Sequence, residues 1–482
     1  MWRRLRLPIG SVARDMATVG TATALGQVAL VVAAPFLARL FTPEAFGYLS
    51  IYLAVIAVIA VVASLRFEFA IPLASDTDEA AHLASLSIVM GLAMSLILGV
   101  VLFALGPQLA ERLGLELPPA LIWLAPAALF VTKSVESLSA LATQQRTFST
   151  LGRARAVQGL TQAATQVALG AARVGAVGLV IGDLVGRIVS LGGLVAAMVP
   201  VLRSADLSAR MMGAYARKRW GFARIMTSAS ILNTVSLQGP FLFIPALFDL
   251  GLSGQYFIAH RLLILPASLV GAGVSQVFLG EASHRLSLGQ GLRVLTRNAA
   301  ISLLVFAVPT YTMVAVGGSA LFVGILGVEW ALAGTFAQIL APWLLISSVA
   351  SPLSTLLLLG RRERESLAFT AVELALKTTS LVVGAALGSL VAGLVLLSFV
   401  SVVVNAAALW RILRVAQVAM GEIAMPAARI LGLCLPSAGL VMLVGLLAPE
   451  LVPIACALGW VLGFALAARH TPQLQAMLSE SG

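Results

Sequence analysis

The chain has 482 residues, of which 60% are hydrophobic and only 11% are charged, and its mean hydropathy is +1.01. This composition excludes a soluble globular fold, because too few polar residues are present to cover a water-exposed surface. A formal net charge of +11 would suit a nucleic-acid-binding protein. The positions of the basic residues, considered below, argue against that function and against a nucleic-acid partner.

Apolar stretches long enough to cross a bilayer as helices recur along the whole chain, about fourteen in all. Short polar links separate them, so the sequence predicts an all-α integral membrane protein with about fourteen transmembrane helices. In chain order the predicted spans cover approximately residues 17–38, 46–64, 83–106, 120–142, 154–172, 175–199, 225–248, 253–279, 299–319, 336–359, 366–387, 389–411, 428–447 and 449–468.

Lysine and arginine gather in alternate links between these spans. With the N-terminus placed inside, about 24 of the 31 basic residues fall on the cytoplasmic side. We therefore predict that both termini are cytoplasmic and that the excess positive charge sets the topology. The link after the second span fits least well, because Arg66 is outnumbered there by the acidic residues Glu68, Asp76, Asp78 and Glu79.

A faint internal similarity relates the first two spans to the seventh and eighth. Phe41 precedes Gly47 by six residues, and Phe248 precedes Gly254 by the same distance. A displacement of six spans predicts two six-helix bundles in parallel pseudo-repeat, followed by two C-terminal helices. The predicted parts are an N-terminal bundle at 1–199, a basic cytoplasmic linker at 200–224, a C-terminal bundle at 225–412, and two additional helices with a cytoplasmic tail at 413–482.

Three predicted spans carry opposite charges three or four residues apart, and therefore on one helix face. The pairs are Lys133 with Glu136, Asp183 with Arg187, and Glu373 with Lys377. Charges at membrane depth are costly unless they face water, a counter-ion or a ligand. Two interpretations stay open: the pairs line a polar cavity, or they only hold helices together. A stripe of Gln158, Gln162 and Thr165 in the fifth span allows the same two interpretations.

A single arginine, Arg261, lies about 12 Å along the eighth predicted span, close to the expected membrane midplane. Its guanidinium either reaches the interface along its flexible stem or faces water or a ligand. Pro266 follows it and removes one helical hydrogen bond, so a bend is expected there. Together with Pro35 in the first span, Pro266 is a candidate hinge.

Motifs for catalysis and cofactor binding are missing from the sequence. None of the lysines follows a glycine, which excludes a P-loop, and the four histidines show no metal-binding spacing. The sequence therefore predicts a transporter with no catalytic residues, no metal site and no cofactor. Its energy would come from a gradient of H⁺ or Na⁺, from a substrate gradient or from a partner.

Six stretches of the chain resemble one family in sequence and in order. They are LFTPEAFG (40–47), RFEFAIPL (66–73), GLVIGDLVG (178–186), GQYFIAHRLLILP (254–266), SQVFLGEAS (275–283) and WALAGTFAQILAPW (330–343). Together they resemble the Wzx-type polysaccharide flippases of the multidrug/oligosaccharidyl-lipid/polysaccharide superfamily, whose relatives include MurJ-type lipid II flippases and MATE drug exporters.

The resemblance implies two six-helix bundles around a central cationic cavity that opens alternately to each side of a bacterial inner membrane. Its implied cargo is an undecaprenyl-pyrophosphate-linked glycan for surface polysaccharide, and membrane lipids, a polysaccharide polymerase and a chain-length regulator are implied partners. On this basis, the candidate substrate-binding residues are Arg261, Lys133, Arg187 and Lys377. The candidate ion-coupling residues are Glu136, Asp183 and Glu373.

Two alternative cargoes and one alternative class stay open at this stage. About fourteen spans also fit the lipid II flippases, although the first two spans lack the buried arginines expected for that cargo. A cation-coupled drug exporter would need a negative cavity, whereas the spans hold four basic and three acidic residues. A membrane enzyme or scaffold of polysaccharide assembly is disfavoured, because the links on the outer side are too short for a catalytic domain.

Overall fold

The computed structural model describes residues 9–112, 118–359 and 363–469. Within these ranges every regular element is helical, and 13 helical stretches are long and apolar enough to cross a membrane. The remaining predicted span, the fifth at 154–172, is also helical, but its arginine and glutamines make it less apolar than the other thirteen. The prediction of an all-α, multi-pass membrane protein is therefore confirmed. The two chain ends, predicted to be cytoplasmic, lie outside the described residues.

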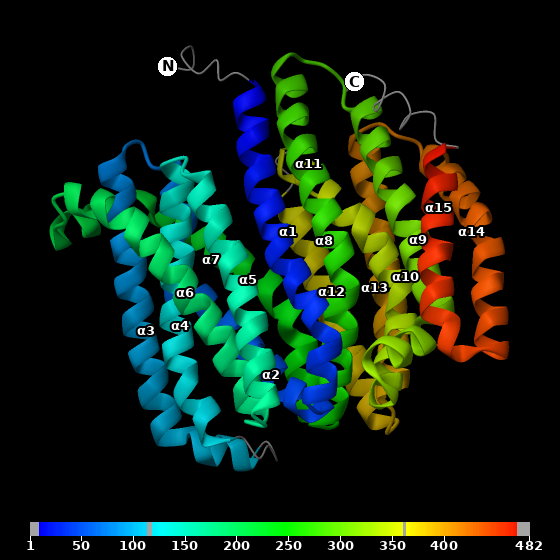
Figure 1. The fold of residues 1–482 in the computed structure, drawn as a ribbon. Helices are drawn as coiled ribbons and strands as arrows, with labels where there is room; N and C mark the ends of the chain where they lie inside the picture. The colour runs from blue at the N-terminus through cyan, green and yellow to red at the C-terminus, as the bar shows by residue number, and fades with distance from the viewer. Residues whose placement is uncertain (1–8, 113–117, 360–362, 470–482) are drawn as a thin grey trace. The chain divides into compact units, whose positions relative to one another are not determined.

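Contacts within the chain divide it into two compact units, Met1–Ala246 and Leu247–Gly482. The helices of the first unit are α1 (Ile9–Leu40), α2 (Pro43–Ala63), α3 (Thr77–Arg112), α4 (Pro119–Gln144), α5 (Phe148–Ala171), α6 (Ala176–Ser204) and α7 (Ala209–Leu247). In this unit α1 packs on α5, α5 on α6, α4 on both α3 and α6, and α2 on both α4 and α6 (Figure 1).

The segment that joins α2 to α3 folds back onto the bundle. Leu65 and Arg66 adopt positive φ angles of 47° and 57°, which turns the chain sharply after α2. Two short 3₁₀ turns follow, η1 (Phe67–Phe69) and η2 (Ile71–Leu73), and both pack against α3 and α4. Burial of the apolar side chains of Phe67 and Ile71 holds this segment in place. The link between the second and third predicted spans is therefore part of the hydrophobic core of the first unit.

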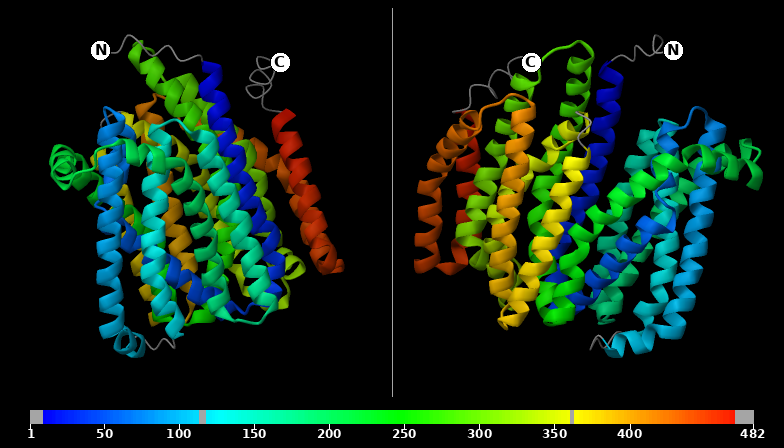
Figure 2. Two further views of the ribbon diagram at one scale, coloured as in Figure 1. Left: turned by 60° about the vertical axis from the view of Figure 1, so that its left-hand side comes forward. Right: turned by 180° about the vertical axis from the view of Figure 1, so that it is seen from behind.

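The second unit contains the remaining helices and two further 3₁₀ turns. Its helices are α8 (Leu250–Ser287), α9 (Arg293–Leu326), α10 (Ala331–Leu353), α11 (Thr355–Leu359), α12 (Glu363–Ala386), α13 (Leu390–Val415), α14 (Gly421–Leu447) and α15 (Val452–Arg469), with the turns η3 (Val328–Trp330) and η4 (Pro449–Leu451). The last two long helices, α14 and α15, pack on each other and on α9 (Figure 2).

The helix packing of the two units follows the same plan. In the first unit α2 packs on α4, α3 on α4, α4 on α6, and α5 on α6. In the second unit α8 packs on α10, α9 on α10, α10 on α13, and α12 on α13. The helices α2 to α6 correspond in order to α8, α9, α10, α12 and α13, each of which lies six spans later in the chain. These four pairs agree with the parallel repeat that the faint sequence similarity predicts, with α14 and α15 as the added pair. The contact of α1 with α5 has no counterpart within the second unit, because α7, the helix six spans after α1, belongs to the first unit.

The two units divide at Ala246, near the end of α7, whereas the sequence predicts a basic linker between the bundles at 200–224. This segment is mostly helical, because it forms the end of α6 and the first half of α7. Ion pairs fix it to the first unit: the carboxylate of buried Glu79 lies 3.0 Å from Lys218 Nζ and 2.8 Å from Arg219 Nε. The guanidinium of Arg219 also donates to the carbonyl of Leu73. The basic residues thus help to dock α7 onto the first unit.

Candidate functional site

A polar cavity of about 240 Å³ lies inside the first helical unit. We call it the arginine cavity. Four apolar residues of α2 and Leu237 of α7 form one part of its wall, and charged or polar side chains from the α2–α3 segment, α4, α6 and α7 form the rest. Its lining consists of Leu53, Ile56, Ala57, Ala60, Arg66, Thr132, Glu136, Arg187, Thr234, Leu237 and Gln238.

Arg187 is held in a fixed orientation at the wall of the arginine cavity. Its Nε lies 2.8 Å from Asp183 Oδ2, one helical turn earlier on α6, and its Nη1 donates to Thr132 Oγ1 at 3.2 Å. The carboxylate of Asp183 is nearly buried, so little water competes for this contact. A guanidinium has five N–H donors, and the contacts to Asp183 and Thr132 leave donors for a ligand.

Lys133 is paired with two carboxylates and does not line the arginine cavity. Its side chain is 0% exposed, and its Nζ lies 2.7 Å from Glu68 Oε1 and 2.6 Å from Glu136 Oε2. Glu136, one turn along α4, is 38% exposed and faces the cavity. The predicted pair of Lys133 with Glu136 is therefore present. Its ammonium stabilises the two carboxylates and is not placed to contact a ligand in this cavity.

Two charged residues at this site, Arg66 and Glu68, were not among the candidates from the sequence. The Arg66 guanidinium lies 3.3 Å from Glu68 Oε1 and 4.9 Å, measured from its carbon atom, from the centre of the Phe69 ring. Burial alone would raise the pKa of Glu68, but the Lys133 ammonium and the Ser64 hydroxyl outweigh it and hold this pKa below its ordinary value. The available signal was the alternation of charged and apolar residues in RFEFAIPL (66–73).

The charges at the arginine cavity are unequal at its surface. Arg66 and Arg187 line it together with a single carboxylate, that of Glu136. Asp183, Glu68 and Lys133 are buried directly behind this wall, so the three basic and three acidic groups of the cluster sum to zero. Arg66 and Arg187 nevertheless present guanidinium groups at the cavity, and their N–H donors suit a ligand rich in acceptors, such as an anion. The hydroxyls of Thr132 and Thr234 and the amide of Gln238 add neutral hydrogen-bonding groups.

The second unit has its own buried polar cluster. Lys377 Nζ lies 2.8 Å from Glu373 Oε1 and 4.2 Å from the centre of the Trp343 ring, so the predicted pair on α12 is present. Asn405 of α13 donates to the same carboxylate at 3.2 Å. The His260 ring lies beside Trp343, at 6.1 Å between ring centres. This cluster joins side chains of α8, α10, α12 and α13 in the unit's interior.

Arg261 also belongs to the second unit, next to His260 on α8. It is partly buried, and its guanidinium carbon lies 5.5 Å from the centre of the Phe257 ring, one turn earlier. Pro266 lies inside α8, which is assigned as one helix from Leu250 to Ser287, and Pro35 lies inside α1 in the same way. A guanidinium packs readily against the face of an aromatic ring, so this contact is favourable for Arg261.

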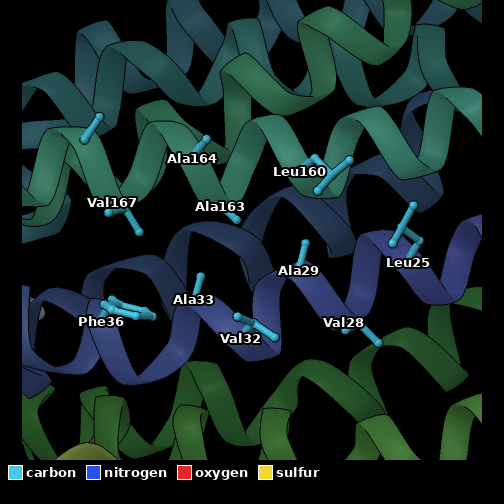
Figure 3. Close-up of a pocket in the computed structure, with 11 residues that line it drawn as sticks. Leu25, Val28, Ala29, Val32, Ala33, Phe36, Leu160, Ala163, Ala164 and Val167 are labelled. Atoms are coloured by element: carbon cyan, nitrogen blue, oxygen red, sulfur yellow. The ribbon is translucent and has the colours of Figure 1, made fainter.

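An apolar groove of about 620 Å³ lies along the contact between α1 and α5 in the first unit. In Figure 3 side chains from both helices face this groove. It is lined only by Leu25, Val28, Ala29, Val32, Ala33, Phe36, Leu160, Ala163, Ala164, Val167 and Ala168. The groove offers no side-chain hydrogen bond and differs in this respect from the arginine cavity.

Comparison with known proteins identifies the family. Residues 36–335, which include all of the arginine cavity, match the family model described as polysaccharide biosynthesis protein. The chain belongs to this family. None of the curated proteins matches the chain. The predicted resemblance to the polysaccharide branch of the superfamily is thereby confirmed.

Solved structures show which fold this polysaccharide biosynthesis family protein adopts. A lipid II flippase MurJ in an inward closed conformation is 12% identical, with a TM-score of 0.72 over 95% of this chain and 98% of MurJ. An inward-facing multidrug resistance MATE family transporter of the MOP superfamily is 14% identical, with a TM-score of 0.58 over 83% of this chain and 94% of its own.

A third similar structure is a MOP superfamily transporter from Pyrococcus furiosus, described as having a binding pocket of reversed polarity. It is 14% identical, with a TM-score of 0.59 over 83% of this chain and 95% of its own. At such low identity these likenesses establish the fold alone. The chain therefore has the fold of the superfamily that includes the MurJ and MATE proteins, as its sequence predicted.

Proposed function

We propose that this protein is a flippase that moves an undecaprenyl-pyrophosphate-linked oligosaccharide across the bacterial inner membrane during surface polysaccharide biosynthesis. The observation that carries the proposal is the arginine cavity, with Arg66 and Arg187 at its wall, in a member of a polysaccharide biosynthesis family. Both chain ends would lie in the cytoplasm, as the distribution of basic residues favours. The superfamily fold supports transport and not catalysis.

A pyrophosphate must leave the aqueous headgroup layer in order to cross the bilayer. Its oxygens then need replacement partners, and arginine offers planar, charge-assisted hydrogen bonds to them. Arg187 is pre-oriented by Asp183 and Thr132, so it loses little conformational freedom when it binds an anion. The two guanidinium groups at the wall offer only hydrogen-bond donors, which do not suit a cationic drug. These features support an anionic lipid carrier.

We propose alternating access as the mechanism. Each of the two units has its own hydrophobic core, so each can move as a rigid body. Pro35 in α1 and Pro266 in α8 would provide the bending points, because each removes a helical hydrogen bond. A polysaccharide polymerase and a chain-length regulator would then act on the cargo after it has crossed.

We predict that Arg261, in the second unit, also binds the pyrophosphate of the lipid carrier during the transport cycle. Arg261→Ala should lower surface-polysaccharide production at least about tenfold, because it removes charge-assisted hydrogen bonds to the carrier. Arg261→Lys keeps the charge but loses the planar fork, so partial activity should remain. The measurement is polymer produced in cells that lack the native gene, normalised to the amount of this protein in the membrane.

Arg285→Ala provides a matched control for this experiment. Arg285 lies on the same helix and pairs with Glu281 at 2.6 Å, and both side chains are partly exposed. Its loss should leave polymer production near the wild-type level. Normal polymer from Arg261→Ala would refute the binding role. Loss of the Arg261→Ala protein from the membrane would instead assign Arg261 to the stability of α8.

We also predict that a carboxylate at the site takes up a proton or cation during transport. Of Glu136, Asp183 and Glu373, Glu136 is the most exposed and shares Lys133 with Glu68. An anionic cargo bound at Arg66 and Arg187 would repel the Glu136 carboxylate and favour its neutralisation.

Transport into proteoliposomes should therefore accelerate under an imposed gradient of H⁺ or Na⁺. Glu136→Gln should remove this dependence, because an amide cannot take up a proton or attract a cation. Asp183→Asn serves as the comparison, since Asp183 is held by two contacts to Arg187. Equal transport by the wild-type protein with and without either gradient would exclude coupling through these carboxylates.

A further inference from the structure

A second polar cavity lies in the first unit, between α1 and α5. It has a volume of about 280 Å³, and we call it the glutamine cavity. Its lining residues come from one short stretch of each helix and are mostly polar. They are Thr23, Gly26, Gln27, Leu30, Arg155, Gln158, Gly159 and Gln162. None of these residues lines the arginine cavity.

Close contacts between helix backbones fix the walls of the glutamine cavity. A Cβ on Gly159 would overlap the carbonyl of Gly26, so α1 and α5 approach closely only because both positions are glycine. On its other side α5 is pressed against α6, where a Cβ on Gly186 would lie 2.8 Å from the carbonyl oxygen of Gln158. The helix α5 therefore has little freedom to rotate, and its polar side chains are held at the cavity.

Three carboxamides converge on the glutamine cavity without protein partners. Gln162 is only 5% exposed, and its neighbours Gln158 and Gln27 are partly buried. In the described part of the chain, none of the three amides hydrogen-bonds to another residue. Their amide atoms are not enclosed by protein, so they are open to the cavity and can hydrogen-bond to water or to a polar ligand there. Their arrangement therefore suits a polar occupant.

The next glutamine of α5, in contrast, has a hydrogen-bond partner in the protein. Gln166 is also buried, but its amide donates to the carbonyl of Leu179 on α6 at 2.8 Å. It therefore serves helix packing, the usual role of such residues in membranes. Farther along the same pair of helices the apolar groove contains no polar side chain. The amides of Gln27, Gln158 and Gln162 thus differ from that of Gln166 in having no hydrogen bond to a neighbouring helix.

We propose that the glutamine cavity binds a sugar unit of the lipid-linked glycan, an inference that rests on the transport function proposed above. Each sugar hydroxyl both donates and accepts hydrogen bonds, and each carboxamide does the same, so the two kinds of group match. Arg155, which donates to Thr23 Oγ1 at 3.4 Å, adds further N–H donors. The cavity lies slightly below the size range of drug-like sites, about 300–1,000 Å³, and suits part of a glycan and not a whole repeat unit. It would recognise the glycan, while the arginine cavity binds the pyrophosphate.

Binding to purified full-length protein in nanodiscs tests this assignment. One probe is the lipid-linked glycan that accumulates in cells lacking this protein, and the other is undecaprenyl pyrophosphate without sugar. The wild-type protein should bind the glycan-bearing carrier at least about tenfold more tightly than the bare carrier, because a site built to hydrogen-bond hydroxyls rejects a ligand that lacks them. The double variant Gln158→Leu with Gln162→Leu should abolish this preference and keep the affinity for the bare carrier.

Gln166→Leu is the matched control on the same helix, and it should keep the preference. If the leucine variants fail to fold, Gln158→Asn with Gln162→Asn shortens the same amides, keeps their polarity and should weaken the preference. The proposal is overturned if the wild-type protein shows no preference, if the preference survives in the double variants, or if Gln166→Leu also loses it. Binding of neither probe by the wild-type protein would instead refute the proposed transport function, on which the inference depends.

Discussion

Replacing Lys133 with methionine should destabilise the protein by about 3–5 kcal/mol, the usual effect of removing one partner from a buried ion pair. The Lys133 ammonium is fully buried and is the shared counter-ion of Glu68 and Glu136. Without it, the buried Glu68 carboxylate keeps only the Ser64 hydroxyl and a longer contact to Arg66. The measurement is unfolding of the purified protein in detergent, followed by the loss of its helical signal.

The reason for this loss can be tested with a second substitution. Glu68→Gln in the Lys133→Met background removes the unpaired buried charge and should restore a large part of the lost stability. Lys218→Met is the matched control: its Nζ lies 3.0 Å from Glu79, but the lysine is 53% exposed and Arg219 also holds that carboxylate. The Lys218→Met substitution should lower the free energy of unfolding by no more than about 1 kcal/mol.

The pH of this experiment follows from the lowered pKa of Glu68. A carboxyl with a depressed folded-state pKa contributes stability above its unfolded pKa and loses this contribution as the pH falls through the folded value. The comparison therefore belongs at neutral pH, where the contribution is complete. Equal stability of Lys133→Met and the wild-type protein there would contradict the account of Lys133 as a buried counter-ion.

The second large effect is expected at the wall of the arginine cavity. Arg66→Gln should lower surface-polysaccharide production about tenfold or more, since a charge-assisted hydrogen bond contributes about 1.5–3 kcal/mol. The fold should tolerate this change, because Glu68 keeps its contacts to Lys133 and Ser64. Arg187→Lys keeps a positive charge beside Asp183 but loses the planar fork, so a similar reduction is expected.

The combination of Arg66→Gln with Arg187→Lys should reduce the polymer to near background. Arg210→Gln is the control, because Arg210 is an exposed arginine at the start of α7 and lies outside the cavity. Polymer and membrane protein are measured in the same cells. Normal polymer from the combined variant would show that the two arginines do not bind the cargo.

Much of this site could be predicted from spacing along single helices. Asp183 and Arg187 are four residues apart on α6, and Glu373 and Lys377 are four apart on α12, so the helical period alone predicts both observed ion pairs. The apolar spans likewise predicted the helices of the fold. The spacing could not show which charges line a cavity. Lys133 was a candidate ligand on the same evidence, yet it is enclosed by carboxylates.

Contacts between distant segments could not be predicted in this way. Arg66 and Glu68 looked like ordinary charges of a link, because only the folding of 64–76 onto α3 and α4 brings Glu68 to Lys133, 65 residues away. The glutamines of α5 show the same limit. Gln162 and Gln166 are one turn apart, almost equally buried, and both lie against glycines of α6, but only the amide of Gln166 donates to a carbonyl of that helix. Their different roles depend on which acceptors lie within reach of each amide.

The most direct test of the central claim is transport by the purified protein in proteoliposomes. The probe is the lipid-linked glycan that accumulates in cells lacking this protein, labelled on its sugar and placed in one leaflet. We predict that vesicles with the wild-type protein move it to the other leaflet much faster than empty vesicles, and that vesicles with the Arg66→Gln and Arg187→Lys variant do not. Equal rates in wild-type and empty vesicles, or full transport by the doubly substituted protein, would contradict the account.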